Sequence, residues 1–242
     1  MLRLHYNLEK ISMGLVGAII VAASIGGLVE IAPLFTIDEV VEVPDDLRPA
    51  TPLELAGREI FIREGCYACH SQMIRSLADE IDRYGPYSLA GESAYDHPML
   101  WGSKRTGPDL ARLGGKYSDR WHVEHLIDPR AVVPASIMPA YPWLTEPLDT
   151  GLLGDELATL ARLGVPYDEA AIAAAEADAR AQSNPDSDGA DGVRERYGED
   201  IAVRAFDGDP SNLTEMDAVV AYLQSLGTLT KAPYKVLAEG KQ

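Results

Sequence analysis

The sequence is poor in cysteine, in aromatic side chains and in positive charge. Only Cys66 and Cys69 carry thiols among its 242 residues. A structural zinc site would need further cysteines or histidines at matching spacing, and the remaining histidines form no second cluster of that kind. Lysine and arginine total 21 against 38 aspartates and glutamates, which gives a net charge of −17. A surface this acidic repels phosphate, so we expect no nucleic-acid partner.

One long apolar run lies near the N-terminus. From Ile11 to Val29 the chain has no charged residue, and as a helix this run rises ~28 Å, close to the thickness of a bilayer core. The apolar core of a cleaved signal peptide is usually ~7–15 residues, which favours a retained anchor over residues 11–35. Arg3 and Lys10 precede the run and acidic residues follow it. The sequence therefore predicts a single-pass protein of a bacterial inner membrane, with residues 1–10 cytoplasmic and the remainder periplasmic.

Small residues recur every fourth position along this predicted membrane helix. Such a ridge lets two helices approach closely in lipid, although glycine and alanine are also common in membrane helices generally. We expect the ridge to pack on a helix of a partner protein. It consists of Gly14, Ala18, Ala22 and Gly26.

The remainder of the chain reads as a tether followed by a mainly α-helical domain. Residues 36–52 contain several prolines among acidic residues, which predicts an extended, stiff segment. The domain is expected over residues 53–230, with a C-terminal tail over 231–242. Within the domain, residues 170–212 are acidic and alanine-rich and are interpreted as an insertion, with a short helix over 170–181 and coil beyond it.

Two helix starts bracket the domain. Thr51 precedes a proline and is followed three residues later by Glu54, which is the pattern of a capped helix N-terminus. Thr214 and Asp217 begin a second apolar helix near the other end. Gly57 in the first helix could allow the second to approach its backbone, although two independent amphipathic helices would show the same pattern.

The two cysteines belong to the sequence Cys66-Tyr-Ala-Cys69-His70. At this spacing each thiol can add to one vinyl group of a haem, and the adjacent imidazole can then bind the iron. A thioredoxin-like redox pair does not require the histidine, and a zinc half-site would need more ligands. The motif therefore favours a single covalently attached haem over these two alternatives.

A proline-bearing loop over Thr106–Leu110 follows the motif in sequence. A backbone carbonyl in such a loop can accept a hydrogen bond from Nδ1 of His70, which would fix the ring and raise its basicity as a ligand. Taken alone, Gly-Pro-Asp is only a turn. Its position after the motif favours Pro108 as the residue that supplies this carbonyl.

A sixth iron ligand would have to come from a thioether or a second imidazole. Met138 is the preferred residue, because prolines on both sides stiffen its loop. Met73 is too close to His70 to reach the opposite haem face, and Met216 begins a helix and is expected in the core. Met99 and His97, in a loop rich in glycine and proline, remain possible. The full set of candidates is four methionines and three histidines, Met73, Met99, Met138, Met216, His97, His122 and His125.

Several longer blocks carry a family resemblance. They are residues 57–75, 101–110, 138–143 and 214–224. Together with the N-terminal anchor they resemble subunit II of cbb3-type cytochrome c oxidases, the FixO or CcoO subunit. The resemblance implies a membrane-anchored class I cytochrome c with one covalent haem c. It also implies a complex with a haem–copper catalytic subunit and a di-haem cytochrome c subunit.

The resemblance assigns roles to individual residues. Cys66 and Cys69 would form the thioether bonds, and His70 and Met138 would be the axial ligands. Two further residues in the shared blocks, Pro108 and Arg75, are assigned to the haem-binding set.

The implied function is electron transfer. Electrons would enter from a soluble cytochrome c, pass over this haem, and reach the catalytic subunit that reduces dioxygen to water. The chain would perform no bond chemistry itself and would be enzymatic only within the oxidase. One alternative is the cytochrome subunit of nitric oxide reductase. Another is a haem-based gas-binding module, which an open sixth position would distinguish from an electron carrier.

The acidic stretch also contains a partial match to a calcium-binding EF-hand loop. Asn184, Asp186, Asp188, Gly189 and Glu195 fall at ligand or turn positions of that motif. Asparagine replaces the usual first aspartate and no clear helix pair is evident around the loop. A solvated acidic loop is the preferred interpretation, with calcium as the minor one.

Overall fold

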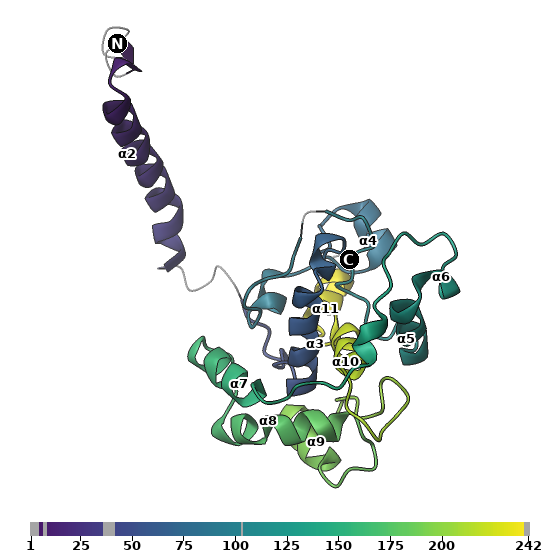
Figure 1. Cartoon of the computed structure of the whole chain (residues 1–242). Helices are drawn as coiled ribbons and strands as arrows, with labels where there is room; N and C mark the ends of the chain where they lie inside the picture. Colours follow the sequence, from purple (N-terminus) through teal and green to yellow (C-terminus); the bar gives the residue numbers. More distant parts are fainter. Residues whose placement is uncertain (1–4, 7–8, 36–41, 103, 240–242) are drawn as a thin grey trace. The chain divides into compact units, whose positions relative to one another are not determined.

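The computed structural model describes residues 5–6, 9–35, 42–102 and 104–239 (Figure 1). The chain divides into two compact units, Met1–Glu42 and Val43–Gln242. The described residues are mainly helical and include no β-strand, only an isolated antiparallel bridge between Pro147 and Thr214. The prediction of a mainly α protein is confirmed.

The first unit contains helix α2, Ser12–Ile31, which continues into the short 3-10 helix η1, Ala32–Phe35. Helix α2 has 20 residues and a mean hydropathy of 2.1, and none of it is buried within the chain. A helix of that length rises ~30 Å, enough to cross the apolar core of a bilayer. The predicted apolar helix is therefore present and fits a single-pass anchor.

The second unit is built around two crossing helices, α3, Pro52–Arg63, and α10, Glu215–Ser225. Both begin with a capping box. The hydroxyl of Thr51 accepts from the backbone N–H of Glu54 at 3.2 Å, and the Glu54 carboxylate accepts from the Thr51 N–H at 2.9 Å. Thr214 and Asp217 form the equivalent pair at the start of α10. Both predicted helix starts are confirmed, because capping is a local property that the sequence encodes directly.

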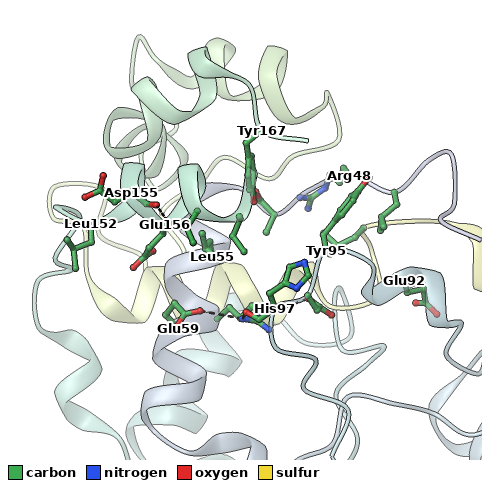
Figure 2. A pocket seen from close by; sticks show the side chains of 17 residues that line it. Arg48, Leu55, Glu59, Glu92, Tyr95, His97, Leu152, Asp155, Glu156 and Tyr167 are labelled. Atoms are coloured by element: carbon green, nitrogen blue, oxygen red, sulfur yellow. Dashed lines mark hydrogen bonds and ion pairs between the residues drawn. The ribbon is translucent and has the colours of Figure 1, made fainter. Parts of the chain in front are cut away.

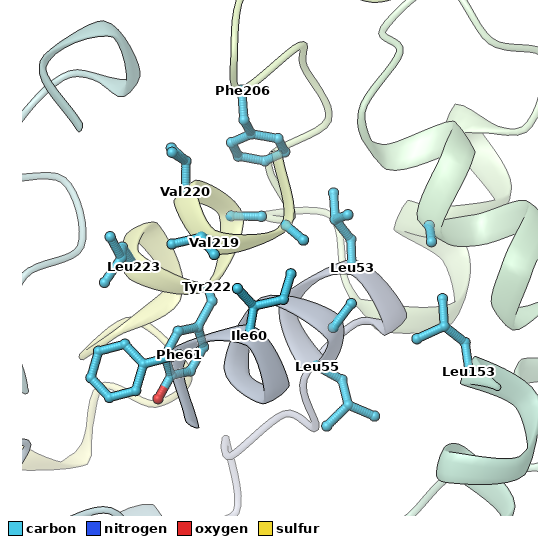
Figure 3. Close-up of a cluster of buried hydrophobic side chains, with 14 of the residues drawn as sticks. Leu53, Leu55, Ile60, Phe61, Leu153, Phe206, Val219, Val220, Tyr222 and Leu223 are labelled. Atoms are coloured by element: carbon cyan, nitrogen blue, oxygen red, sulfur yellow. The ribbon is translucent and has the colours of Figure 1, made fainter. Parts of the chain in front are cut away.

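The crossing of α3 and α10 depends on Gly57. A Cβ atom at this position would lie 1.9 Å from the carbonyl oxygen of Ala218 and 2.8 Å from Cβ of Tyr222. One turn further along, the rings of Phe61 and Tyr222 meet edge to face with centroids 5.5 Å apart. Figure 3 shows apolar side chains of the two helices at this crossing; Phe206 and Leu153, from other segments, belong to the same buried cluster. The close approach expected at Gly57 is therefore present.

Further helices complete this unit. They are η2 Cys66–Ala68, α4 Ala78–Tyr84, η3 Ala90–Ser93, α5 Asp119–Ile127, α6 Pro129–Val132, η4 Pro142–Thr145, α7 Leu153–Arg162, α8 Glu169–Gln182, α9 Ala190–Tyr197 and α11 Ala232–Glu239. Helix α8 packs against α3, α7 and α9, so α7, α8 and α9 cover one end of the central pair (Figure 1).

The structure differs from the expected tether in the second half of residues 36–52. Residues 36–41 lie outside the described residues, but the compact unit begins already at Val43. Arg48 makes two hydrogen bonds to the Glu54 carboxylate, at 2.7 and 2.8 Å, and its N–H donates to the carbonyl of Leu229 at 3.1 Å. This segment is therefore bound to the domain by hydrogen bonds. Its proline content predicts an extended chain but does not predict these bonds.

The acidic stretch over 170–212 contributes side chains to the domain core, and the coil expected beyond residue 181 includes helix α9, Ala190–Tyr197. Ala175 and Ala179 of α8 and Val193 of α9 are buried in the central apolar cluster. Asp178 of α8, only 2% exposed, forms an ion pair with Arg196 of α9. The predicted helix over 170–181 is present as α8, but helix α9 replaces part of the predicted coil.

Candidate functional site

The cysteine motif begins where α3 ends. Gly65 adopts a left-handed backbone with φ of 72°, which turns the chain out of the helix into η2. Within the turn, the N–H groups of Cys69 and His70 both donate to the carbonyl of Cys66, at 3.1 and 2.9 Å. Cys66 is half-buried and Cys69 is exposed, and both are free thiols. The turn therefore holds two thiols and an imidazole on one short, hydrogen-bonded segment.

The thiol environment does not suit a thioredoxin-like pair. Burial, followed by the nearby Glu64 carboxylate, raises the pKa of Cys66 to about 11. Thiol–disulfide exchange requires the thiolate, and reactive cysteines accordingly have a lowered pKa. The pKa shift at Cys66 is thus opposite in direction to the one found at cysteines that carry out thiol–disulfide exchange.

Metal binding by clustered acidic, thiol or imidazole side chains has no support in the described part of the chain. No group of three or more His, Cys, Asp or Glu residues within it could hold a metal ion. The described residues therefore give no support to the zinc alternative at the cysteine motif or to the calcium interpretation of Asn184–Glu195. In the latter segment α9 already begins at Ala190, so its backbone is helical where an EF-hand loop would still wrap around the ion.

His70 lies against the Thr106–Leu110 loop. Its Nδ1 is 2.8 Å from the carbonyl oxygen of Pro108. Because a carbonyl can only accept, this contact places the ring proton on Nδ1 and leaves the lone pair on Nε2. A Cβ atom at Gly107 would lie 2.4 Å from Cε1 of the same ring, so only glycine leaves room for the imidazole here. The loop thus fixes both the tautomer and the position of His70.

The loop that carries Met138 is hydrogen-bonded to a residue next to the cysteine motif. The indole N–H of Trp143 donates to the Glu64 carboxylate at 3.2 Å, and the Tyr141 and Trp143 rings meet at 5.5 Å. Burial, followed by proximity to Cys66 and Cys69, raises the pKa of Tyr141. Met138 itself is partly buried and packs against the apolar core.

The other candidates for a sixth ligand lie in different surroundings. Met216 is fully buried in the core of α10, as expected from its position at a helix start. Met99 is 49% exposed. His97 lines a separate cavity of about 370 Å³ between α3, α7 and Tyr95, which contains no residue of the cysteine motif (Figure 2). Met73 is half-buried, and its backbone is held by the loop after Pro108.

Two histidines of α5 lie in an aromatic cluster. Burial lowers the pKa of His122 to about 4, so this side chain is neutral at physiological pH. His125 stacks on Trp121 with centroids 4.6 Å apart, and its pKa is lowered by burial and then by His70. Within the described residues, Nδ1 of His125 is buried without a hydrogen-bond partner. The sequence singled out His125 only as one of several possible ligands and gave no sign that it lies near His70.

Arg75 lies at the edge of the same region. Its side chain is exposed and donates to the Glu80 carboxylate at 2.6 Å. It lines a polar cavity of about 400 Å³ together with Arg105, Gly107 and Pro108. The structure therefore brings Arg75 close to the loop that holds His70.

These residues fit a covalently attached haem. The site offers two thiols, an imidazole whose Nε2 is available as a ligand, and a glycine that accommodates the ring. Exposed apolar side chains, Tyr67 in η2 and Trp143 bonded to Glu64, lie at the motif and could cover an apolar macrocycle. A helical domain with one such motif defines the class of mono-haem c-type cytochromes.

Comparison with known families identifies the chain more closely. The family described as "Cytochrome C oxidase, mono-heme subunit/FixO" matches residues 5–230, which include both the anchor helix and the cysteine motif. The chain belongs to this family and is thus a mono-haem cytochrome c subunit of cbb3-type oxidases. A search of curated proteins gives no match.

Proposed function

We propose that this chain carries electrons toward the haem–copper catalytic subunit of the oxidase, which reduces dioxygen to water. The observation that carries the proposal is the contact of His70 Nδ1 with the Pro108 carbonyl in the space left by Gly107, next to both cysteines. The match of the oxidase family to nearly the whole chain supports the same role and favours it over a nitric oxide reductase subunit.

Each residue of the site would have a defined task. Cys66 and Cys69 would hold the haem by thioether bonds, and His70 and Met138 would bind the iron from opposite faces. Pro108 orients the His70 ring through its carbonyl. Arg75 would lie at the haem-binding region as a charged contact. The bound haem supplies one-electron chemistry by cycling between ferric and ferrous iron.

The partners follow from the anchor and the charge. The basic residues before α2 favour a cytoplasmic N-terminus and a periplasmic haem domain. There it would meet the catalytic subunit and the di-haem cytochrome c subunit. The net charge of −17 would also favour a basic soluble cytochrome c as donor, since complementary charge accelerates association.

The axial assignment can be tested by substitution. Met138→Ala is expected to abolish the weak absorption band of iron–thioether bonding and to open a position that binds carbon monoxide, because alanine offers no ligand. Absorption spectra of the purified chain with and without carbon monoxide measure both effects. Met99→Ala is the matched control and should leave the spectrum unchanged. The reverse result would assign the ligand to Met99, and carbon monoxide binding by the unaltered chain would instead favour a gas-binding module.

The small-residue ridge of α2 gives a test of the membrane partner. Ala18 and Ala22 are exposed along the helix. Replacing both with leucine keeps the segment apolar but holds a partner helix away, so the chain should insert and receive haem yet assemble poorly. Co-purification through a tagged catalytic subunit measures this, with Val16→Leu and Ile20→Leu together, on the opposite face of the helix, as the control. Undiminished recovery of the Ala18/Ala22 variant would show that the ridge makes no such contact.

A further inference from the structure

The residue after Pro108 is a wholly buried carboxylate. The side chain of Asp109 is 0% exposed. Its Oδ2 accepts hydrogen bonds from the Ser71 hydroxyl at 2.6 Å and from the Met73 N–H at 2.9 Å, and it lies 3.3 Å from Nη2 of Arg105. Its Oδ1 accepts from the N–H of Ala111 at 2.8 Å. Both oxygens of this carboxylate therefore accept hydrogen bonds.

These bonds join the two segments that meet at His70. Ser71 and Met73 lie one and three residues after the histidine, whereas Asp109 and Ala111 lie one and three residues after Pro108, whose carbonyl the histidine contacts. Two backbone bonds run alongside, from Gly107 N–H to Cys69 O at 2.9 Å and from Leu110 N–H to Ser71 O at 2.8 Å. The bonds between residues 69–73 and residues 107–111 together form a clamp, to which Asp109 contributes the side-chain bonds. This clamp keeps the Pro108 carbonyl in place against the ring.

Arg105 and Glu80 complete the clamp and balance its charge. Arg105 donates to the Ser71 hydroxyl and to the Met73 carbonyl, each at 2.7 Å. The same guanidinium makes two 2.7 Å bonds to Glu80. Hydrogen bonds from Arg105, and then from Arg75, lower the pKa of Glu80 to about 2, so this carboxylate stays ionised. A neutral residue at position 109 would take one negative charge from this buried network while Arg105 and Glu80 remain charged.

We propose that Asp109 is a positioning residue for the axial histidine, and that its carboxylate sets how strongly the imidazole donates to the haem iron by holding the Pro108 carbonyl against Nδ1. This inference rests on the function proposed above. The ring and the loop are already in contact at Gly107, so a displacement of the loop reaches the ring directly. A weaker bond to Nδ1 lowers the basicity of the ligand, which disfavours ferric iron.

Asp109→Asn is the most informative substitution. Asparagine keeps the size of the side chain but replaces one oxygen with a donor, which must then face either the Ala111 N–H or the three donors at Oδ2. The midpoint potential of the full-length, haem-bearing chain should rise. We expect a threefold to tenfold change in the reduction equilibrium, about 28 to 59 mV for a one-electron couple. Electron paramagnetic resonance of the ferric form should show altered g-values, because the imidazole is no longer held in one orientation.

Asp178→Asn is the matched control. Asp178 is equally buried and is also paired with an arginine, but its partner Arg196 belongs to α9 and not to the His70 loop. This variant should lose stability and keep the potential and g-values of the unaltered chain. Ser71→Ala removes a single member of the clamp and should raise the midpoint potential by a smaller amount. This variant tests the proposal if Asp109→Asn does not fold.

Two results would overturn the proposal. One is an unchanged midpoint potential in Asp109→Asn. If Asp109→Asn does not fold, an unchanged midpoint potential in Ser71→Ala has the same meaning. The other is an equal shift in Asp178→Asn, which would attribute the effect to general loosening of the fold. Failure of the underlying function is recognised separately, because the unaltered chain would then carry no covalently bound haem and no potential to compare.

Discussion

Replacing Gly57 by alanine is expected to destabilise the domain by about 3 kcal/mol or more, at the upper end of overpacking effects. The usual effect of this change inside a helix is opposite, a gain of about 1 kcal/mol, because alanine is the better helix former. Here the added methyl would lie 1.9 Å from the Ala218 carbonyl oxygen, and two main chains would have to separate. The loss should appear as a lower Tm and a lower midpoint in urea for the haem-bearing chain.

Gly192→Ala serves as the control for this prediction. Gly192 is also inside a helix, but an added Cβ would meet only the guanidinium of Arg196, at 3.0 Å, which is the flexible end of a side chain. Its stability should be unchanged or slightly higher. If Gly57→Ala unfolded at the same urea concentration as Gly192→Ala, α3 and α10 would not cross as closely as described.

Gly107→Ala should have the second large effect, on the haem site and not on the helix pair. The new methyl would lie 2.4 Å from Cε1 and 2.8 Å from Nδ1 of His70, so the ring must leave the Pro108 carbonyl. We expect most of the low-spin haem signal to be lost, with a marked fall in haem content relative to protein. Quantitative absorption spectra of protein purified from the membrane would measure both.

Thr106→Ala is the matched control on the same loop, because the side chain of Thr106 is exposed. It should retain its haem and its low-spin spectrum. A Gly107→Ala variant with normal haem content and spectrum would mean that His70 does not lie against this loop when haem is bound.

The features that the sequence predicts well are those encoded within a few residues. The capping boxes at Thr51 and Thr214 and the apolar run of α2 fall in this group, because each depends on neighbouring side chains alone. The cysteine motif belongs here too, since the spacing of its residues is itself the signal.

The features that the sequence predicts poorly depend on contacts between distant segments. Residues 43–52 read as a tether because of their prolines, yet Arg48 donates hydrogen bonds to the Glu54 carboxylate and the Leu229 carbonyl. The acidic segment after residue 181 reads as coil, yet helix α9 forms there and Val193 is buried in the apolar cluster. Asp109 reads as a turn residue, and only the fold shows that its carboxylate joins the two sides of the His70 contact.

The central claim is that Cys66 and Cys69 hold a haem covalently. The direct measurement is peroxidase staining for haem after denaturing electrophoresis of the chain expressed where c-type haem is attached. The account predicts that haem stays on the polypeptide of the unaltered chain, and that Cys66→Ser with Cys69→Ser loses it completely. Haem that leaves the unaltered chain on denaturation, or that stays on the double variant, would contradict the account.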